Sequence, residues 1–299
     1  MRKSWKTWVA LVAFALAGQG VLALAIDEAA SATPAAPQVR AVATIFPVAS
    51  IVREIGGERV AVTTIVSSGV CPHEFEIAPA AAKAIDQADV VFMVARCFDG
   101  WVIPAGGIPK GPAWVEFAQA VRDSLIRIGD TFNPHFWLDP RLAGEMGKTV
   151  GRELARIDPA DSAFYADRTK IFTARIDSLD AALRATLADT DAKEFVALHP
   201  AWAYFAKRYG LVEQDVLEMS PEQEPSAKWI GRVLKDMKRH SIKVVIGEEA
   251  APQELVQMVA RESGARVIVL DPLGGETKPG RNTYFALMGY NASKLGAGR

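Results

Sequence analysis

One long helical pattern divides this sequence: residues 158–187 read DPADSAFYADRTKIFTARIDSLDAALRATL. Asp158 is a suitable N-cap, and Pro159 suits the first helical position. Side chains then recur along one face, at Phe164, Arg168, Ile171, Phe172, Ile176, Leu179, Leu183 and Leu187. This pattern predicts a helix over residues 159–189, about 45 Å long, that links two lobes; an ordinary surface helix fits the periodicity equally well.

Short β-branched runs alternate with helical patterns on both sides of this helix, which is typical of βα units with parallel sheets. In the first half, strands are expected near residues 40–45, 60–66, 89–94 and 113–118. In the second half, strands are expected near residues 194–198, 211–217, 243–247 and 266–270. The sequence therefore predicts an α/β protein whose two halves occupy residues 39–158 and 190–299.

The composition is that of a folded protein, because 50% of the 299 residues are hydrophobic and only 23% are charged. The 34 Lys and Arg residues nearly balance the 35 Asp and Glu residues, and the basic run Lys238-Arg239-His240 is short. A chain that binds nucleic acid normally carries a basic patch or stripe. We therefore exclude nucleic acid as a partner.

The N-terminus has the features of a secretory signal peptide over residues 1–25. Positive charges among the first six residues precede an apolar run from Trp8 to Ala17, and Ala23-Leu24-Ala25 resembles a cleavage site. An uncleaved membrane anchor is the alternative, but a span needs about 20 apolar residues and this run is interrupted at residues 18–20. Cleavage would leave a flexible leader over residues 26–38, and we expect export to the periplasm.

Three of the four histidines share one setting, because His73, His135 and His199 each adjoin a proline in a segment that follows a predicted strand. Asp271 follows the last predicted strand in the same way. Ligands of open α/β sheets bind beyond the carboxyl ends of the strands. Three imidazoles and one carboxylate form a suitable donor set for a four-coordinate ion such as zinc. The sequence therefore contains the parts of a metal site.

Each of these residues also has a simpler interpretation. A histidine beside a proline is often only a hydrogen-bonded loop residue, and Asp271 could cap a turn before Pro272. The fourth histidine, His240, lies at the end of a charged helical stretch, where a favourable interaction with the helix dipole explains it. We exclude His240 from the metal site.

A series of motifs occurs in order along the chain: GVCPHEFE at 69–76, NPHFWLDP at 133–140, HPAWAYF at 199–205 followed by YGL at 209–211, EPS at 224–226, and LDPLG at 270–274. Together with the stretch at 284–295, this series resembles that of the zinc/manganese solute-binding proteins of bacterial ABC transporters. The resemblance covers nearly the whole chain after the expected signal peptide.

The resemblance implies two lobes, each with a mainly parallel four-stranded sheet flanked by helices, joined by one long rigid helix. It places one metal ion in the cleft between the lobes, with His73, His135, His199 and Asp271 as ligands. Manganese-binding members tend to have a carboxylate where this chain has His199, and imidazole suits zinc better than manganese. Zinc is therefore our first expectation and manganese the alternative, with affinity falling as the histidines are protonated.

The resemblance further implies capture and delivery of the metal without chemistry on it. The expected partner is a membrane ABC permease, a periplasmic metallochaperone is a further candidate, and a monomer is expected. The alternatives are a metal-binding adhesin on the same scaffold and a secreted zinc hydrolase. A catalytic zinc needs an open coordination position, which Asp271 would close as a ligand.

The sequence departs from the family pattern in two respects that bear on the site. Residues 100–130 contain no histidine, although many zinc-binding members carry a histidine-rich loop there. Cys71 and Cys97 are also unusual; in an oxidising compartment they predict a disulfide, and Cys71 as a thiolate ligand is the alternative. Metal-bound imidazoles usually donate their second N–H to an acceptor, and Glu248 and Glu249 are candidates for this role.

Overall fold

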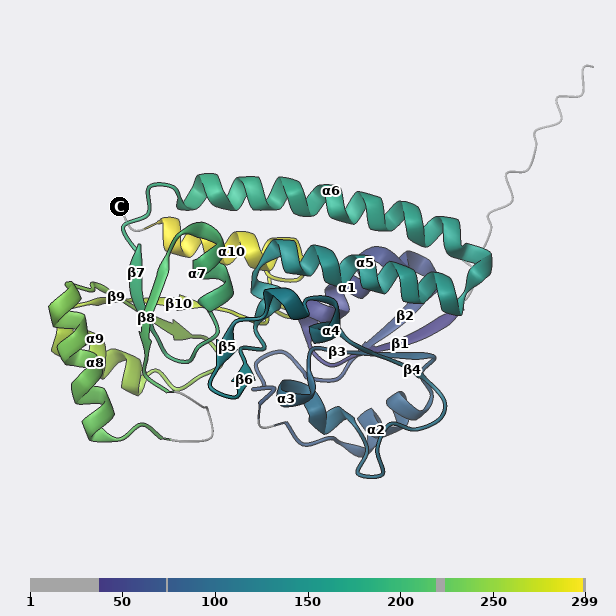
Figure 1. Ribbon diagram of the computed structural model, residues 1–299, viewed down its shortest axis with the longest axis horizontal. Coiled ribbons are helices and arrows are strands. Elements are labelled where there is room, and N and C mark those ends of the chain that lie inside the picture. The colour runs from purple at the N-terminus through teal and green to yellow at the C-terminus, as the bar shows by residue number, and fades with distance from the viewer. Residues whose placement is uncertain (1–37, 74, 219–223, 298–299) are drawn as a thin grey trace, which may run out of the picture. The chain divides into compact units, whose positions relative to one another are not determined.

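Two four-stranded parallel sheets form the framework of the fold (Figure 1). The first sheet has the order β2-β1-β3-β4, with β1 at Val39–Ala43, β2 at Val60–Thr64, β3 at Val90–Met93 and β4 at Ala113–Glu116. The second sheet has the order β10-β9-β7-β8, with β7 at Glu194–Ala197, β8 at Val212–Val216, β9 at Val244–Glu248 and β10 at Arg266–Leu270. The predicted α/β fold with two lobes is confirmed.

The protein is described here by a computed structural model over residues 38–73, 75–218 and 224–297. These residues belong to the unit that spans Ala36–Arg299. The expected signal peptide at 1–25 and all of the expected leader except Gln38 lie outside the described residues. Within the described part of the chain, no helix combines the length and the apolar character that a membrane span requires.

Helices flank both sheets (Figure 1). In the first lobe they are α1 at Phe46–Gly56, α2 at Pro79–Asp86, α3 at Arg96–Asp99 and α4 at Phe117–Ala120, followed by a small antiparallel pair of β5 at Arg127–Ile128 and β6 at Thr131–Phe132. Two longer helices follow, α5 at Pro140–Ile157 and α6 at Ser162–Leu187. In the second lobe they are α7 at Ala203–Tyr209, α8 at Ala227–His240, α9 at Glu254–Ser263 and α10 at Tyr284–Gly296.

Two central strands, β3 and β9, are buried along their whole length between the helices that flank the sheets. Every residue of β3 (VVFM) and of β9 (VVIGE) is buried. Strands of parallel sheets that are covered on both faces read as continuous hydrophobic runs rather than as alternating patterns. Glu248 is the exception, because it is a buried charged residue at the carboxyl end of β9.

The expected linking helix is present as α6, but it begins later than predicted. Pro159–Asp161 forms a short 3₁₀ turn, and α6 begins at Ser162. Asp158 does not cap the helix as we expected; its carboxylate accepts a hydrogen bond from the Tyr165 hydroxyl at 2.9 Å. The sequence pattern includes Ile171 in the recurring face of this helix, but this residue is 59% exposed. The buried face is therefore narrower than the pattern predicts.

Helix α6 runs beside α5 and α10, and it contacts both (Figure 1). The contact with α5 is close at Gly151, where a Cβ atom would lie 2.1 Å from the Thr169 hydroxyl oxygen. Thr169 cannot easily move away because this hydroxyl donates to the Tyr165 carbonyl at 2.7 Å. Only glycine therefore fits at position 151 with the helices at this separation.

Hydrogen bonds join the first lobe to the segment around α10. The Trp137 indole N–H donates to the Pro272 carbonyl at 2.9 Å. Tyr284, at the start of α10, donates its backbone N–H to the Ser50 hydroxyl and its own hydroxyl to the Trp137 carbonyl, both at 2.8 Å. These three bonds are buried, and they hold the loop after β10 against the first lobe.

Candidate metal centre

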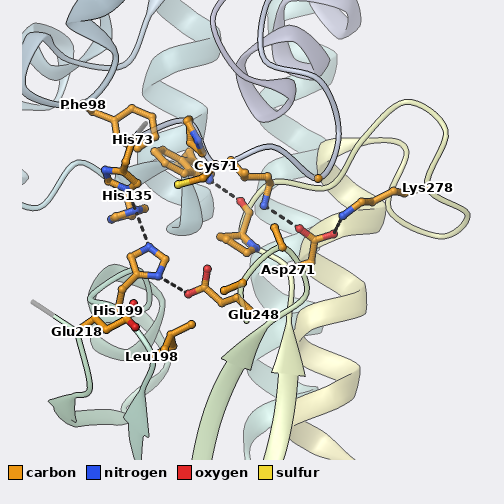
Figure 2. Close-up of a pocket in the computed structure, with 17 residues that line it drawn as sticks. Cys71, His73, Phe98, His135, Leu198, His199, Glu218, Glu248, Asp271 and Lys278 are labelled. Atoms are coloured by element: carbon orange, nitrogen blue, oxygen red, sulfur yellow. Dashed lines mark hydrogen bonds and ion pairs between the residues drawn. The ribbon is translucent and has the colours of Figure 1, made fainter. Parts of the chain in front are cut away.

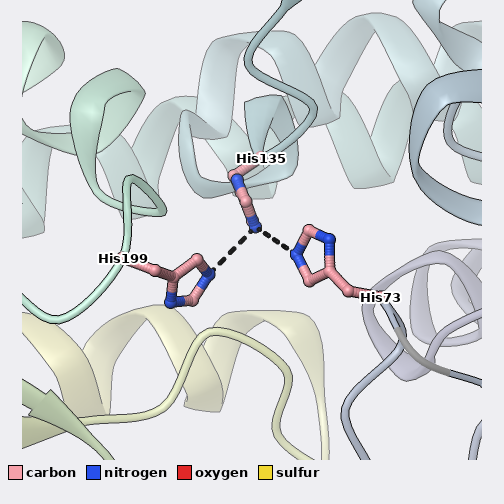
Figure 3. A group of neighbouring side chains, drawn as sticks. All are labelled: His73, His135 and His199. Atoms are coloured by element: carbon pink, nitrogen blue, oxygen red, sulfur yellow. Dashed lines mark hydrogen bonds between the residues drawn. The ribbon is translucent and has the colours of Figure 1, made fainter. Parts of the chain in front are cut away.

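Three imidazoles from three separate loops point toward one another (Figure 3). His73 follows β2, His135 follows β6 at the start of a 3₁₀ turn, and His199 follows β7. The Nε2 atom of His135 lies 3.4 Å from Nε2 of His73 and 3.3 Å from Nε2 of His199. One nitrogen from each ring lies within 4.8 Å of the other two. The structure therefore brings together the three histidines singled out from the sequence.

The two spacings between the His135 nitrogen and the other two nitrogens match tetrahedral zinc. A zinc–imidazole bond is about 2.0–2.1 Å long, so two nitrogens at a tetrahedral angle lie about 3.3–3.4 Å apart. The two measured Nε2 separations, 3.4 and 3.3 Å, have this value. Three neutral imidazoles at this spacing can act together as nitrogen donors to one divalent ion.

Asn133 holds His135 in place. Its side-chain oxygen lies 2.9 Å from the His135 Nδ1 atom and accepts the His135 backbone N–H, also at 2.9 Å. The Asn133 amide donates to the Pro200 carbonyl at 2.5 Å, beside His199. A proton on Nδ1 leaves Nε2 free to bind a metal. The sequence analysis did not predict this role for Asn133. An Asn two residues before His135 could have indicated it, because Asn side chains often accept the backbone N–H two residues further on.

Glu248 plays the corresponding part for His199. Its carboxylate lies 2.6 Å from the His199 Nδ1 atom, and the two side chains are only 6% and 11% exposed. Burial alone would lower the pKa of His199, but the carboxylate of Glu248, together with those of Glu213 and Glu218, outweighs burial and raises that pKa above its ordinary value. Glu248, one of the two candidates from the sequence, is therefore the carboxylate that pairs with an imidazole. Figure 2 shows the pair at the edge of the pocket.

The other two imidazoles are neutral at physiological pH. Burial, reinforced by the nearby His199, lowers the pKa of His73 to about 4. Burial also lowers the pKa of His135 well below its ordinary value. Phe98 supplies much of this apolar environment, because its ring centre lies 4.8 Å from that of His73 and 5.7 Å from that of His135. Neutral imidazole is the form that binds metals.

Further carboxylates lie around His199 on the second lobe. Burial raises the pKa of Glu213 to about 7, and burial also raises the pKa of Glu218. Glu213 accepts the Trp202 backbone N–H at 3.1 Å, whereas Glu218 lines the pocket that contains the three imidazoles. Both carboxylates also contribute to the raised pKa of His199.

Asp271 lines the same pocket, but its carboxylate lies outside the group formed by the three imidazoles among the described residues (Figure 2). One of its oxygens accepts the backbone N–H groups of Leu273 and Gly274, at 3.1 and 2.9 Å. The other oxygen accepts from Lys278 and Arg281, both at 2.9 Å. The residue predicted as the fourth ligand is thus engaged in four hydrogen bonds.

Glu249 does not accept from an imidazole, although the sequence made it a candidate for that role. Its carboxylate instead accepts from Lys278 at 2.8 Å and from Arg281. These two hydrogen bonds lower the pKa of Glu249 to about 2. Glu249 is therefore a carboxylate anion that balances the two cations beside Asp271.

The two cysteines are not joined by the expected disulfide in the structure. Cys97 lies on α3, where its thiol is hydrogen-bonded to the Thr131 side chain, and burial raises the pKa of this thiol. Cys71 lines the metal pocket, but the donor group among the described residues consists of the three imidazoles alone.

A family model, the zinc-uptake complex component A of the periplasm (ZnuA), matches residues 41–298. The chain belongs to the ZnuA family. The match begins in β1 and extends through α10, so it includes both lobes and all three imidazoles. The assignment agrees with the resemblance carried by the sequence motifs, and it places the chain among solute-binding proteins.

Individual members of the ZnuA family support this assignment. The chain is 28% identical over 264 residues to the high-affinity zinc uptake system protein ZnuA of Bacillus subtilis, covering 83% of this chain and 82% of the relative. It is 27% identical over 274 residues to the zinc-binding lipoprotein AdcA of Streptococcus pneumoniae, covering 85% of this chain but only 54% of AdcA. A crystal structure of ZnuA superimposes with a TM-score of 0.76 at 26% identity, covering 87% of this chain and 98% of that one.

Proposed function

We propose that this protein captures one zinc ion in the periplasm and delivers it to a membrane ABC permease for import. The observation that carries the proposal is the convergence of the three Nε2 atoms at 3.3 and 3.4 Å. The proposed ligands are His73, His135, His199 and Asp271. Membership of the ZnuA family and the names of its zinc-binding relatives support the same function.

The donor chemistry favours zinc over manganese. Three neutral imidazoles and one carboxylate leave a divalent ion with a net charge of +1, and nitrogen donors suit zinc, whereas manganese prefers oxygen donors. His73 and His135 have lowered pKa values, so they are ready to bind without losing a proton. Binding at His199 releases the proton that Glu248 stabilises there.

The functional division of the chain follows from this assignment. We propose a signal peptide at 1–25, a leader at 26–38, metal-binding lobes at 39–158 and 190–299, and a linking helix at 159–189. We propose that the protein acts as a monomer and that its docking partner is the permease, with a periplasmic metallochaperone as a second candidate. We also propose a disulfide between Cys71 and Cys97 in the oxidised protein, and thiol labelling tests it.

The decisive experiment is a competitive zinc titration, with manganese beside it, on metal-stripped protein that begins at residue 26. The variants are His199→Ala and, as a matched control, His240→Ala. We expect the wild type and the control to bind one zinc tightly and manganese far more weakly, and His199→Ala to lose most of the zinc affinity. Weak zinc binding by the wild type, or a His199→Ala variant that binds like it, would refute the proposed site.

A further inference from the structure

Four charged side chains beside the imidazoles form one closed network, which we call the Asp271 clamp. Its members are two carboxylates, Asp271 and Glu249, and two cations, Lys278 and Arg281. Each cation contacts both carboxylates, so the formal charges cancel. The Asp271 and Lys278 side chains lie at the pocket that holds the histidines (Figure 2).

The clamp occupies the acceptor positions that a metal would need. A carboxylate offers about four lone-pair positions, and Asp271 makes four hydrogen bonds: two to backbone N–H groups and two to the clamp cations. The side chain is 4% exposed, so water cannot readily replace a lost partner. Asp271 can therefore reach a metal only by giving up some of these contacts, and the oxygen that accepts from Lys278 and Arg281 makes no bond to the backbone.

When Asp271 exchanges the two cations for a metal, the backbone of Asp271 and the loop that carries the cations are both held in place. Asn291 on α10 accepts the Asp271 backbone N–H at 2.9 Å and donates to the Asp271 carbonyl at 2.7 Å. The loop that carries the cations is tied to the first lobe, because Glu276 accepts from Arg53 at 2.6 Å and from Thr64 at 2.9 Å. The exchange therefore requires rotation of the Asp271 side chain rather than movement of a lobe.

Glu249 is placed to hold the cations when Asp271 leaves. It already accepts from both of them, and its side chain is 44% exposed. Lys278 and Arg281 are only 16% and 13% exposed, and a largely buried cation without a partner is strongly disfavoured. Without Glu249, the two cations would hold Asp271 more tightly.

We propose that Lys278 and Arg281 compete with the metal for Asp271, and that Glu249 receives them when Asp271 binds the metal. These three residues then set the affinity of the centre without touching the ion. The inference rests on the proposed function, because it requires Asp271 to act as a metal ligand. It predicts that removing a cation strengthens zinc binding and that removing Glu249 weakens it.

The test is a double-mutant cycle read by competitive zinc titration of the full chain after metal removal. Lys278→Met should bind zinc about tenfold more tightly than the wild type, the effect expected from losing one charge-assisted hydrogen bond. Glu249→Gln should bind zinc more weakly. Lys207→Met, which removes an exposed cation from α7, is the matched control and should bind like the wild type.

The same substitutions in an Asp271→Asn background separate competition from simple charge repulsion. If the cations act by holding Asp271, the effects of Lys278→Met and Glu249→Gln disappear in this background. If both effects persist unchanged, the cations act only through long-range repulsion and the proposal is overturned. Lys278→Met binding that equals or falls below that of the wild type also overturns it.

Two measurements complete the test. Should Lys278→Met fail to fold, acetylation of Lys278 in the wild type replaces it: zinc should speed labelling, because the amine loses one of its two carboxylate partners, and unchanged labelling overturns the proposal. His199→Ala in the same series distinguishes failure of the proposed metal site from failure of the competition for Asp271. If it binds like the wild type, the proposed function fails; if it loses zinc while Lys278→Met gains nothing, only the competition fails.

Discussion

Replacing Glu248 by glutamine should weaken zinc binding at alkaline pH but not at acidic pH. Glu248 lies 2.6 Å from the His199 Nδ1 atom, and both side chains are almost completely buried. Glutamine keeps the shape of the side chain and an oxygen that can accept the Nδ1–H. The substitution therefore removes the negative charge and little else.

The magnitude follows from the type of hydrogen bond that is lost. A bond to a charged group contributes about 1.5–3 kcal/mol, and a neutral one contributes about 1 kcal/mol. The difference of about 0.5–2 kcal/mol corresponds to a loss of roughly 2- to 30-fold in zinc affinity at a pH where His199 is neutral. Loss of an acceptor behind a metal-bound histidine has effects of the same order.

At acidic pH the same charge acts in the opposite direction. Glu248 raises the pKa of His199, so in the wild type a proton competes with the metal for this imidazole as the pH falls through that pKa. Glutamine removes the support for the proton as well as for the metal. The affinity ratio of wild type to variant should therefore shrink toward one below the unperturbed histidine pKa of about 6.5.

The assay is a chelator-competition titration at about pH 8 and about pH 5.5, on either side of the histidine range. Nuclear magnetic resonance titration of the metal-free protein follows the His199 imidazole directly, and its pKa should fall in Glu248→Gln. Glu262→Gln, on the exposed end of α9, removes an equal charge elsewhere and serves as the control. An affinity ratio that does not change with pH, or an unaltered His199 pKa, would refute this account of Glu248.

Three further predictions follow from the same structure. Zinc affinity of the wild type should fall about tenfold per pH unit below the raised pKa of His199, because zinc binding there displaces one proton. The affinity should fall more steeply below about pH 4, where His73 also becomes protonated. A steeper slope already at neutral pH would contradict the lowered pKa of His73. Gly151→Ala should lower the free energy of unfolding, measured by urea denaturation, by about 1–2 kcal/mol. The reason is that the added Cβ would lie 2.1 Å from the Thr169 hydroxyl oxygen. A second substitution, Thr169→Ala, should restore most of the lost stability. His240→Ala should leave zinc affinity unchanged in titration, since His240 is exposed at the end of α8, and a loss of about tenfold would show that it belongs to the site.

The strands could be predicted from the sequence because short β-branched runs alternate with helical patterns. β10 spans the predicted residues 266–270, and β3 lies within the predicted 89–94. Helix boundaries were less predictable. Asp139-Pro140 and Asp158-Pro159 are the same dipeptide, but Asp139 caps α5 by accepting from Arg141 at 2.8 Å, whereas Asp158 binds Tyr165. The hydrogen bond from Tyr165 to Asp158 is what distinguishes the two Asp-Pro dipeptides in the structure.

The histidines of the site could be predicted because each adjoins a proline in a segment after a strand. Two of them, His73 and His199, follow strands of the parallel sheets, whose carboxyl ends are where ligands bind. The surroundings of Asp271 could not be predicted. Its partners Lys278 and Arg281 lie in a loop whose shape depends on Gly274, where φ is +68° and a Cβ would lie 2.7 Å from the Arg281 carbonyl oxygen. No periodic pattern encodes such a loop.

The position of Tyr284 has a consequence for how this chain acquires its structure. Its backbone bond to Ser50 closes 234 residues of chain, and its hydroxyl bond to Trp137 closes 147. Contacts of such long sequence separation slow folding, because loop-closure entropy is lost before the contacts form. We therefore expect the packing of the first lobe to be completed only after Tyr284 is in place. On this expectation the two lobes complete their folding together rather than in the order of translation.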